Sequence, residues 1–309
     1  TSGAQQCCWR AAKLPLPHRL SMSSFASFLA LPFPNIDPVA FQLGPVTVKW
    51  YGLAYMAGLV LGWLYIRRLL RNPALWSGGK PPFGVEKTDD LLFFMTLGVV
   101  LGGRLGFVLF YEPLYYLNHP AEILQVWRGG MAFHGALVGC GIAIWAFARR
   151  AGVSPLSSMD MCAAAVPIGL FFGRIANFIN GELFGRPTEV PWGMVFPEAM
   201  YQYAAIEPTP RHPSQLYEAF LEGLVLFLVL RWMTHQAHAL KSPGLVAGTF
   251  MVGYGVARSF CEFFRQPDPL HPLTIGFLTP GIAYSIPMIL AGLYFIRAAR
   301  ARSSPVSQP

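Results

Sequence analysis

Long apolar blocks separated by short polar linkers dominate the pattern along the chain. Seven blocks are long enough, at about 1.5 Å per helical residue, to cross a hydrocarbon layer of about 30 Å. They cover residues 50–70, 91–111, 131–148, 156–180, 214–233, 244–264 and 275–296. The pattern predicts an all-α, polytopic integral membrane protein with seven transmembrane helices, in which residues 46–300 form a single domain.

The two ends of the chain differ from this domain. Residues 1–45 hold a short apolar run that Pro32 and Pro34 interrupt, and no clear cleavage site follows it. The run either belongs to a fragment of a signal peptide or, as the weak targeting signal favours, the natural start lies near Met22 and the residues before it are an extension. We predict a partly disordered tail at 1–45 and a disordered tail at 301–309.

Positive residues indicate how the helices are oriented. Lys and Arg gather in the linkers after the first, third, fifth and seventh predicted helices, and Arg67, Arg149 and Arg300 are examples. Cytoplasmic loops of membrane proteins carry an excess of positive residues, so this side should be cytoplasmic. The N-terminus is then predicted outside and the C-terminus inside.

Composition narrows the classes of function. Hydrophobic residues make up 54% of the chain and charged residues 12%, about half the charged share of a soluble domain, so a soluble enzyme is excluded. The net charge of +8 is explained by cytoplasmic loops and contact with anionic lipid, and we expect no nucleic-acid partner. The five Cys residues show neither zinc-ligand spacing nor a disulfide framework, and we expect no metal site.

Polar residues inside the apolar blocks point to a functional site. A charge at bilayer depth costs about 2.5–3.5 kcal/mol, so it needs a partner or a ligand. Counting from the helix ends places one group of polar residues in the same half of the membrane. The group comprises Arg104, Arg174, Arg258, Tyr51, His134, His212, Tyr217 and Glu218. A cluster confined to one leaflet indicates a binding or catalytic site rather than a pore through the whole bilayer.

The spacing of the arginines suggests the ligand. Arg174 and Asn177 share one helical face, and so do Tyr254, Arg258 and Glu262. Two or three arginines without matching acids at that depth suggest a bound anion, and a phosphate suits the planar set of guanidinium donors. A phospholipid headgroup is the anion most available at that depth.

Three residues allow a structural as well as a functional interpretation. His134 is a candidate general base at the mouth of an apolar helix, although a lone histidine is more often structural; the neighbouring arginines favour the functional interpretation. Arg104 is expected to close a structural ion pair rather than to touch substrate. Glu222, one turn after Glu218, is expected to pair with an arginine.

Four motifs carry a resemblance to a known family. They read Phe-His-Gly at 133–135, Gly-Arg-Ile-Ala-Asn-Phe-Ile-Asn-Gly-Glu-Leu-Phe-Gly-Arg at 173–186, Arg-His-Pro-Ser-Gln-Leu-Tyr-Glu at 211–218 and Glu-Phe-Phe-Arg-Gln-Pro-Asp at 262–268. Over residues 35–297 the chain resembles the bacterial prolipoprotein diacylglyceryl transferases.

The resemblance implies a multi-pass enzyme of the bacterial inner membrane with its active site toward the periplasm. Such an enzyme moves the diacylglyceryl group of phosphatidylglycerol to the lipobox cysteine of a prolipoprotein and releases glycerol phosphate. This reaction is the first step of bacterial lipoprotein maturation, and it calls for no cofactor. The implied partners are therefore phosphatidylglycerol, the lipobox peptide and membrane lipid.

The resemblance also implies roles for single residues. The family's essential histidine falls on His134, and its phosphate-binding arginines fall on Arg174 and Arg258. The other positions predicted to act in catalysis or to bind phosphatidylglycerol are Tyr51, Tyr254, Asn177, Glu182, Gly185, His212, Glu262 and Arg265. We expect His134, or else Tyr51 or Tyr254, to take the proton of the attacking thiol.

Two other functions remain open on the sequence. A membrane transporter or binding protein for an anionic lipid or solute would also hold arginines in its helices, but a transporter favours an inverted repeat and a midplane site. An intramembrane protease would need Ser214 or Ser259 as nucleophile, and neither lies in a Gly-x-Ser-x-Gly turn.

Overall fold

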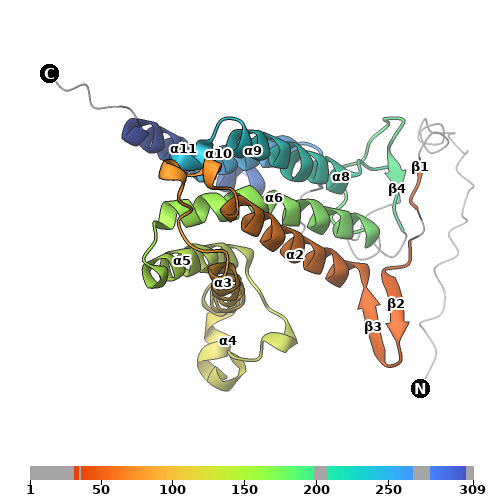
Figure 1. The fold of residues 1–309 in the computed structure, drawn as a ribbon. Coiled ribbons are helices and arrows are strands. Elements are labelled where there is room, and N and C mark those ends of the chain that lie inside the picture. The colour runs from red at the N-terminus through yellow and green to blue at the C-terminus, as the bar shows by residue number, and fades with distance from the viewer. Residues whose placement is uncertain (1–30, 35, 198–207, 267–278, 304–309) are drawn as a thin grey trace, which may run out of the picture.

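Helices dominate the computed structural model, which describes residues 31–34, 36–197, 208–266 and 279–303 (Figure 1). The long helices are α2 (Trp50–Leu70), α3 (Lys87–Phe110), α5 (Phe133–Ala151), α6 (Pro155–Ile179), α10 (Leu245–Cys261) and α11 (Pro280–Ser303). A further helix runs from α8 (Ser214–Glu218) through a π-helical turn (Ala219–Val225) to α9 (Leu226–His235). Each of the seven predicted blocks therefore overlaps a helix.

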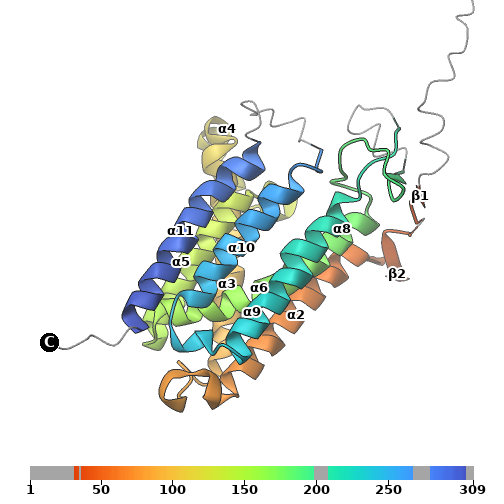
Figure 2. The ribbon, with the colours of Figure 1, turned by 90° about the horizontal axis from the view of Figure 1, so that it is seen from above.

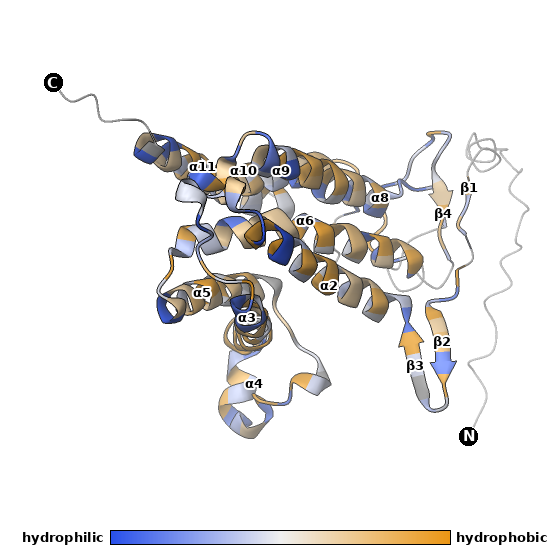
Figure 3. Ribbon diagram, in the orientation of Figure 1, coloured by the Kyte–Doolittle hydropathy of each residue, from blue (hydrophilic) through white to orange (hydrophobic). Residues whose placement is uncertain are grey.

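Several helices have the length and the outer surface of membrane spans. By length and composition, α2, α3, α6 and α11 can cross a membrane, and α10 is a shorter apolar helix. Apolar side chains such as Leu59, Leu101 and Leu290 are exposed, and the hydropathy colouring of the ribbon shows that the helices are largely apolar (Figure 3). The chain is a mostly helical membrane protein, while the seven crossings and the orientation of the termini stay predictions.

Two small sheets depart from the all-α expectation. β2 (Val39–Leu43) and β3 (Val46–Lys49) form an antiparallel hairpin whose turn contains Gly44 at φ +58°. β1 (Leu31–Pro32) pairs in parallel with β4 (Met194–Val195). β1 and β2 both fall within residues 1–45, the segment that the sequence analysis assigned to the tail.

The helices pack in pairs, and glycines let two of these pairs approach closely. A Cβ on Gly102 of α3 or on Gly135 of α5 would collide with the carbonyl oxygen of the other. A Cβ on Gly248 of α10 would lie 2.8 Å from the carbonyl oxygen of Gly292 on α11. Figure 1 shows the α3–α5 pair on one side of the α2–α6 pair, and α8 to α11 on the other.

The main apolar core fixes the helices at one end of the bundle, where α2 ends and α6 begins. There the buried carboxylate of Asp160 on α6 accepts the backbone N–H groups of Gly244 and Ala247, both at 2.7 Å. These bonds satisfy free donors at the N-terminus of α10. Both helices then run to the opposite end of the bundle, where Arg174 and Arg258 lie.

Candidate active site

One buried carboxylate gathers three arginines from three parts of the chain. Glu218, at the end of α8, has no exposed side-chain surface. Its Oε2 lies 2.9 Å from Nε of Arg174 on α6. Its Oε1 lies 3.1 Å from Nη1 of Arg258 on α10 and 3.0 Å from Nη1 of Arg265, just after α10. Glu218 is thus the centre of an arginine cluster that joins α6, α8 and α10.

Two further carboxylates complete the cluster. Oε2 of Glu222 lies 3.2 Å from Nη2 of Arg174, so the expectation that Glu222 pairs with an arginine is confirmed. Oε2 of Glu262 lies 2.7 Å from Nη2 of Arg258. The expectation of arginines without matching acids is therefore wrong, because three carboxylates hold the three guanidinium groups and the formal charges balance.

The carboxylates lie behind the arginines rather than in front of them. The side chains of Glu218 and Glu222 are fully buried, whereas those of Arg174, Arg258 and Arg265 are 17, 15 and 18% exposed. Buried carboxylates offset the mutual repulsion of the guanidinium groups and fix their geometry. The cluster therefore keeps an arginine surface that an anion can approach.

A π-helical turn places Glu222. Residues Ala219–Val225 form this wide turn, a rare geometry that occurs often at functional sites. Gly223 of the turn lies against Phe171 of α6, where a Cβ would be 2.7 Å from the Phe171 Cβ. The turn therefore packs directly on α6, the helix that carries Arg174. The apolar periodicity of this block gave no sign of it.

The loop after α6 is fastened beside the cluster. Nδ2 of Asn177 donates to Oε1 of Glu182 at 2.7 Å, and Nε2 of the buried Gln215 donates to the carbonyl oxygen of Glu182 at 2.6 Å. A Cβ on Gly185 would lie within 2.6 Å of two backbone carbonyl oxygens, those of His212 and Phe264. Only glycine fits where these three segments meet, so Asn177, Glu182 and Gly185 fix the loop after α6 beside the arginine cluster, and a part in binding the lipid stays a prediction.

The sequence analysis did not single out Arg211 and Gln266, which lie around Gly185. The guanidinium of Arg211 is buried; its Nη1 donates to the carbonyl oxygen of Gly185 at 3.2 Å and to Oε1 of Gln266 at 3.1 Å. Arg211 opens one of the four motifs and Gln266 belongs to another, which is the signal that could have found them. They fasten the segments around Gly185 to each other.

His212 and the two predicted tyrosines lie in different surroundings. Nδ1 of His212 is 3.1 Å from the hydroxyl of Tyr217, and partial burial lowers the pKa of His212. Tyr254 lies on α10 one turn before Arg258, on the face that leads to the cluster. The hydroxyl of Tyr51, in the first turn of α2, lies 3.0 Å from the hydroxyl of Tyr55.

His134 is the second residue of α5, but its side chain lies outside the described residues. Its contact with the cluster stays a prediction. Among the described residues, no group of three or more His, Cys, Asp or Glu side chains is arranged to hold a metal ion.

Known proteins with similar sequences identify the family of this chain. The model of the prolipoprotein diacylglyceryl transferase family matches residues 38–298. The chain belongs to this family. It is 52% identical over 285 residues to the phosphatidylglycerol–prolipoprotein diacylglyceryl transferase of Rhizobium meliloti (strain 1021), which covers 92% of the chain and 99% of that relative.

Two further relatives carry the same name. The protein of Methylocella silvestris is 51% identical over 273 residues, 88% of the chain and 97% of the relative. That of Nitrobacter winogradskyi is 50% identical over 282 residues, 91% of the chain and 94% of the relative. Membership of the diacylglyceryl transferase family favours an enzyme over the transporter and protease alternatives.

Arg104 stands apart from the arginine cluster. Its side chain is buried, and Nε donates to the carbonyl oxygen of Ile123 at 2.8 Å. Nη1 donates to Gly129 at 2.6 Å, and Nη2 donates to Glu122 at 2.7 Å, again to carbonyl oxygens. The sequence predicted an ion pair here; the guanidinium instead binds main-chain carbonyl groups of the segment between α3 and α5.

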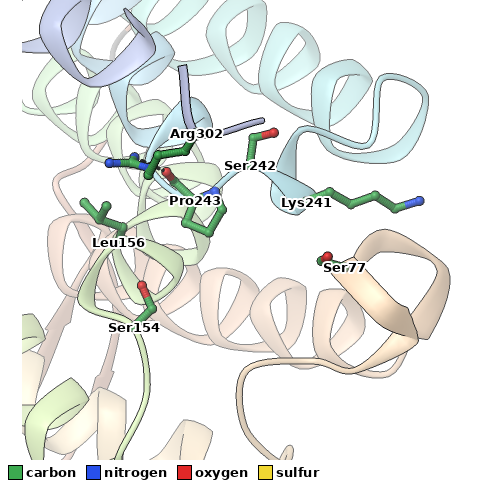
Figure 4. Close-up of a pocket in the computed structure, with 7 residues that line it drawn as sticks. All are labelled: Ser77, Ser154, Leu156, Lys241, Ser242, Pro243 and Arg302. Carbon is green, nitrogen blue, oxygen red and sulfur yellow. Dashed lines mark hydrogen bonds between the residues drawn. The ribbon is translucent and has the colours of Figure 1, made fainter. Parts of the chain in front are cut away.

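A pocket of about 550 Å³ lies at the opposite end of the bundle from the arginine cluster, where α6 begins and α11 ends (Figure 4). It is lined by Ser77, Ser154, Leu156, Lys241, Ser242, Pro243 and Arg302. Lys241 and Arg302 make it positively charged, but its position separates it from the site.

Proposed function

We propose that this member of the diacylglyceryl transferase family transfers the diacylglyceryl group of phosphatidylglycerol to the lipobox cysteine of prolipoproteins and releases glycerol phosphate. The observation that carries the proposal is the group of three partly exposed guanidinium groups held on the buried carboxylate of Glu218. Such an arrangement suits a phosphate whose charge grows during the reaction.

Arg174 and Arg258 hold the lipid phosphate in this proposal. Each of these two guanidinium groups contacts carboxylates through two of its nitrogens. Among the described residues, Nη1 of Arg174 and Nε of Arg258 have no carboxylate partner. These donors are preorganised, so they bind the departing phosphate without the cost of reorganising solvent. Arg265 adds a third positive charge at the same carboxylate.

The reaction exchanges one bond at the glyceryl carbon. The cysteine sulfur forms a bond to that carbon as the carbon–oxygen bond to phosphate breaks, and the phosphate keeps the electron pair. A free thiol has a pKa of about 8.5, so it reacts only after losing its proton. His134 takes that proton, with Tyr51 or Tyr254 as alternative acceptors. Asn177, Glu182, Gly185, His212 and Glu262 shape the pocket for the lipid.

The enzyme is proposed to act at the periplasmic side of the bacterial inner membrane, where it meets the lipobox peptide. Basic residues support this orientation, since Arg67, Arg149 and Arg300 lie in the last turns of α2, α5 and α11. Those turns lie at the end of the bundle opposite the arginine cluster. By the positive-inside rule, the cluster then faces the periplasm.

Mass spectrometry of a lipobox peptide tests the function directly. Purified protein incubated with phosphatidylglycerol should raise the mass of the intact peptide by one diacylglyceryl group. His134→Gln and Arg258→Ala should abolish the product, whereas Arg297→Ala, a change of an exposed arginine at the far end of α11, should not. Product at the wild-type rate from both site variants would remove the proposed roles. Cleavage of the peptide would support a protease instead.

A further inference from the structure

The segment between α3 and α5 has its apolar side chains on the outside. Residues 111–127 contain no Lys or Arg and fold into the short helix α4 (Pro113–Asn118) followed by two 3-10 turns. Leu114, Leu117, Leu124 and Trp127 are 75 to 77% exposed. Glu112, Asn118 and His119 are exposed as well, but so large an exposed apolar patch is unusual for a loop that faces only water.

Two main-chain carbonyl groups and one aromatic ring of the same segment are held from the inside. The buried guanidinium of Arg104 holds the carbonyl oxygens of Glu122 and Ile123. The hydroxyl of Tyr115 donates to the Glu122 carboxylate at 3.0 Å, and the Tyr116 ring is buried 5.1 Å from the Arg104 guanidinium carbon. These contacts fix the conformation of the segment, so the fold itself holds the apolar side chains on the outside.

This surface continues the lipid-facing side of α3. Leu101, Leu105 and Leu109 recur every four residues on one exposed face of α3, a helix that can span a membrane. Phe110, the last residue of α3, and Leu114 beyond it continue the exposed apolar surface. Figure 2 places α4 at the end of the bundle where α8 begins, which is the end of the site.

We propose that residues 111–127 form an interfacial anchor that lies in the headgroup layer of the membrane. Leu114, Leu117, Leu124 and Trp127 enter the outer part of the acyl-chain region, while the exposed Glu112 faces water. Phospholipid is the occupant because the surface is continuous with a lipid-facing helix. Trp, Tyr and Leu are the residues that favour this layer.

The anchor also fixes the depth of the entrance to α5. Arg104 binds Glu122 within the segment and Gly129 just after it. Gly129 and Gly130 lead into α5, so a segment seated in the headgroup layer holds the start of that helix at the same level. This inference does not depend on the transferase reaction.

Quenching of Trp127 fluorescence tests the anchor. The full chain is placed in vesicles of phosphatidylcholine and phosphatidylglycerol whose acyl chains carry bromine either near the headgroup or near the chain end. The difference between wild type and Trp127→Phe isolates the signal of Trp127. We expect bromine near the headgroup to quench this signal about twofold more than bromine at the chain end, with little quenching by aqueous acrylamide.

Trp76→Phe gives the reference for a buried indole, because Trp76 is only 4% exposed. Leu117→Lys should make Trp127 accessible to acrylamide, whereas Leu117→Ile should not. Strong acrylamide quenching in the wild type, with no effect of bromine, would overturn the proposal. Protection from both quenchers together with a crosslinked dimer would overturn it too, since a second copy would then cover the surface.

Discussion

Arg104 and the arginine cluster show two ways of keeping a guanidinium inside a membrane protein. The donors of Arg104 bind main-chain carbonyl oxygens, and the residue is buried. Arg174 and Arg258 bind the carboxylates around Glu218 and stay partly exposed.

We interpret the difference as one between a structural arginine and arginines that serve the proposed site. Main-chain carbonyl groups and the face of the Tyr116 ring hold the Arg104 guanidinium, so that residue shapes a loop. Carboxylates balance the charge of the cluster, and among the described residues Nη1 of Arg174 and Nε of Arg258 have no carboxylate partner, which suits the proposed binding and release of an anion. Residue type and depth alone would have placed all three arginines in one class.

Removing the shared carboxylate should have the largest effect. Glu218→Ala leaves three guanidinium groups without their common partner, and breaking a buried ion pair costs about 3–5 kcal/mol. We expect complete loss of transfer and a lower midpoint of thermal unfolding in detergent. Glu112→Ala, which removes an exposed glutamate, is the control. A folded Glu218→Ala protein with wild-type transfer would show that the two kinds of arginine do not differ in function.

A charge-conserving change at Arg258 should have the next largest effect. Lysine keeps the positive charge but cannot bridge Glu218 and Glu262 while presenting a third donor to phosphate. We expect Arg258→Lys to lower kcat by about 10²–10³, the usual cost of losing one preorganised donor, with the unfolding midpoint nearly unchanged. A change in KM alone would mean that Arg258 binds the ground state without stabilising the departing phosphate.

Arg104→Gln should lower the stability of the protein with little effect on transfer, the opposite of Arg258→Lys. Its loss breaks charged hydrogen bonds worth about 1.5–3 kcal/mol each before relaxation, so the unfolding midpoint should fall clearly. Transfer per folded molecule should stay within about threefold of wild type, because no donor to substrate is removed. A large fall in kcat at an unchanged midpoint would place Arg104 in the chemistry and erase the contrast.

The smallest expected effect concerns pH. Burial lowers the pKa of His212 below its ordinary value of 6.5, so the folded state binds fewer protons there than the unfolded state. The contribution of His212 to the free energy of unfolding is therefore fully present above its ordinary pKa of 6.5. It is lost as the pH falls through the pKa of the folded state. His212→Asn should flatten the fall of the unfolding midpoint in acid. An unchanged slope in the His212→Asn variant would contradict this prediction.

The sequence predicted the helices better than the contacts between them. The block at 50–70 begins and ends with α2, because apolar length alone defines such a helix. The hairpin at Val39–Lys49 was missed, although apolar residues alternate on both sides of Gly44. The π-helical turn could not be found, because one additional residue in a helical turn leaves the apolar composition of the block unchanged.

The motifs predicted which arginines belong together but not which carboxylates pair with them. Arg174, Arg258 and Arg265 were all predicted, and they do lie together. Their common partner Glu218 could not be assigned, because its partners come from three helical regions whose packing no local pattern encodes. Arg104 was misjudged for the same reason, since its acceptors are carbonyl oxygens and backbone atoms leave no signature in a sequence.

The equal number of positive and negative groups in the arginine cluster has a consequence for turnover. A cluster with surplus positive charge would retain glycerol phosphate and slow its release. If the arginine cluster binds the donor phosphate, as we propose, its balanced charge should attract a small free anion only weakly, and most of the affinity for the donor should come from its two fatty chains. Product inhibition by glycerol phosphate should therefore be slight, and a competitive inhibitor of this enzyme will need a hydrocarbon tail.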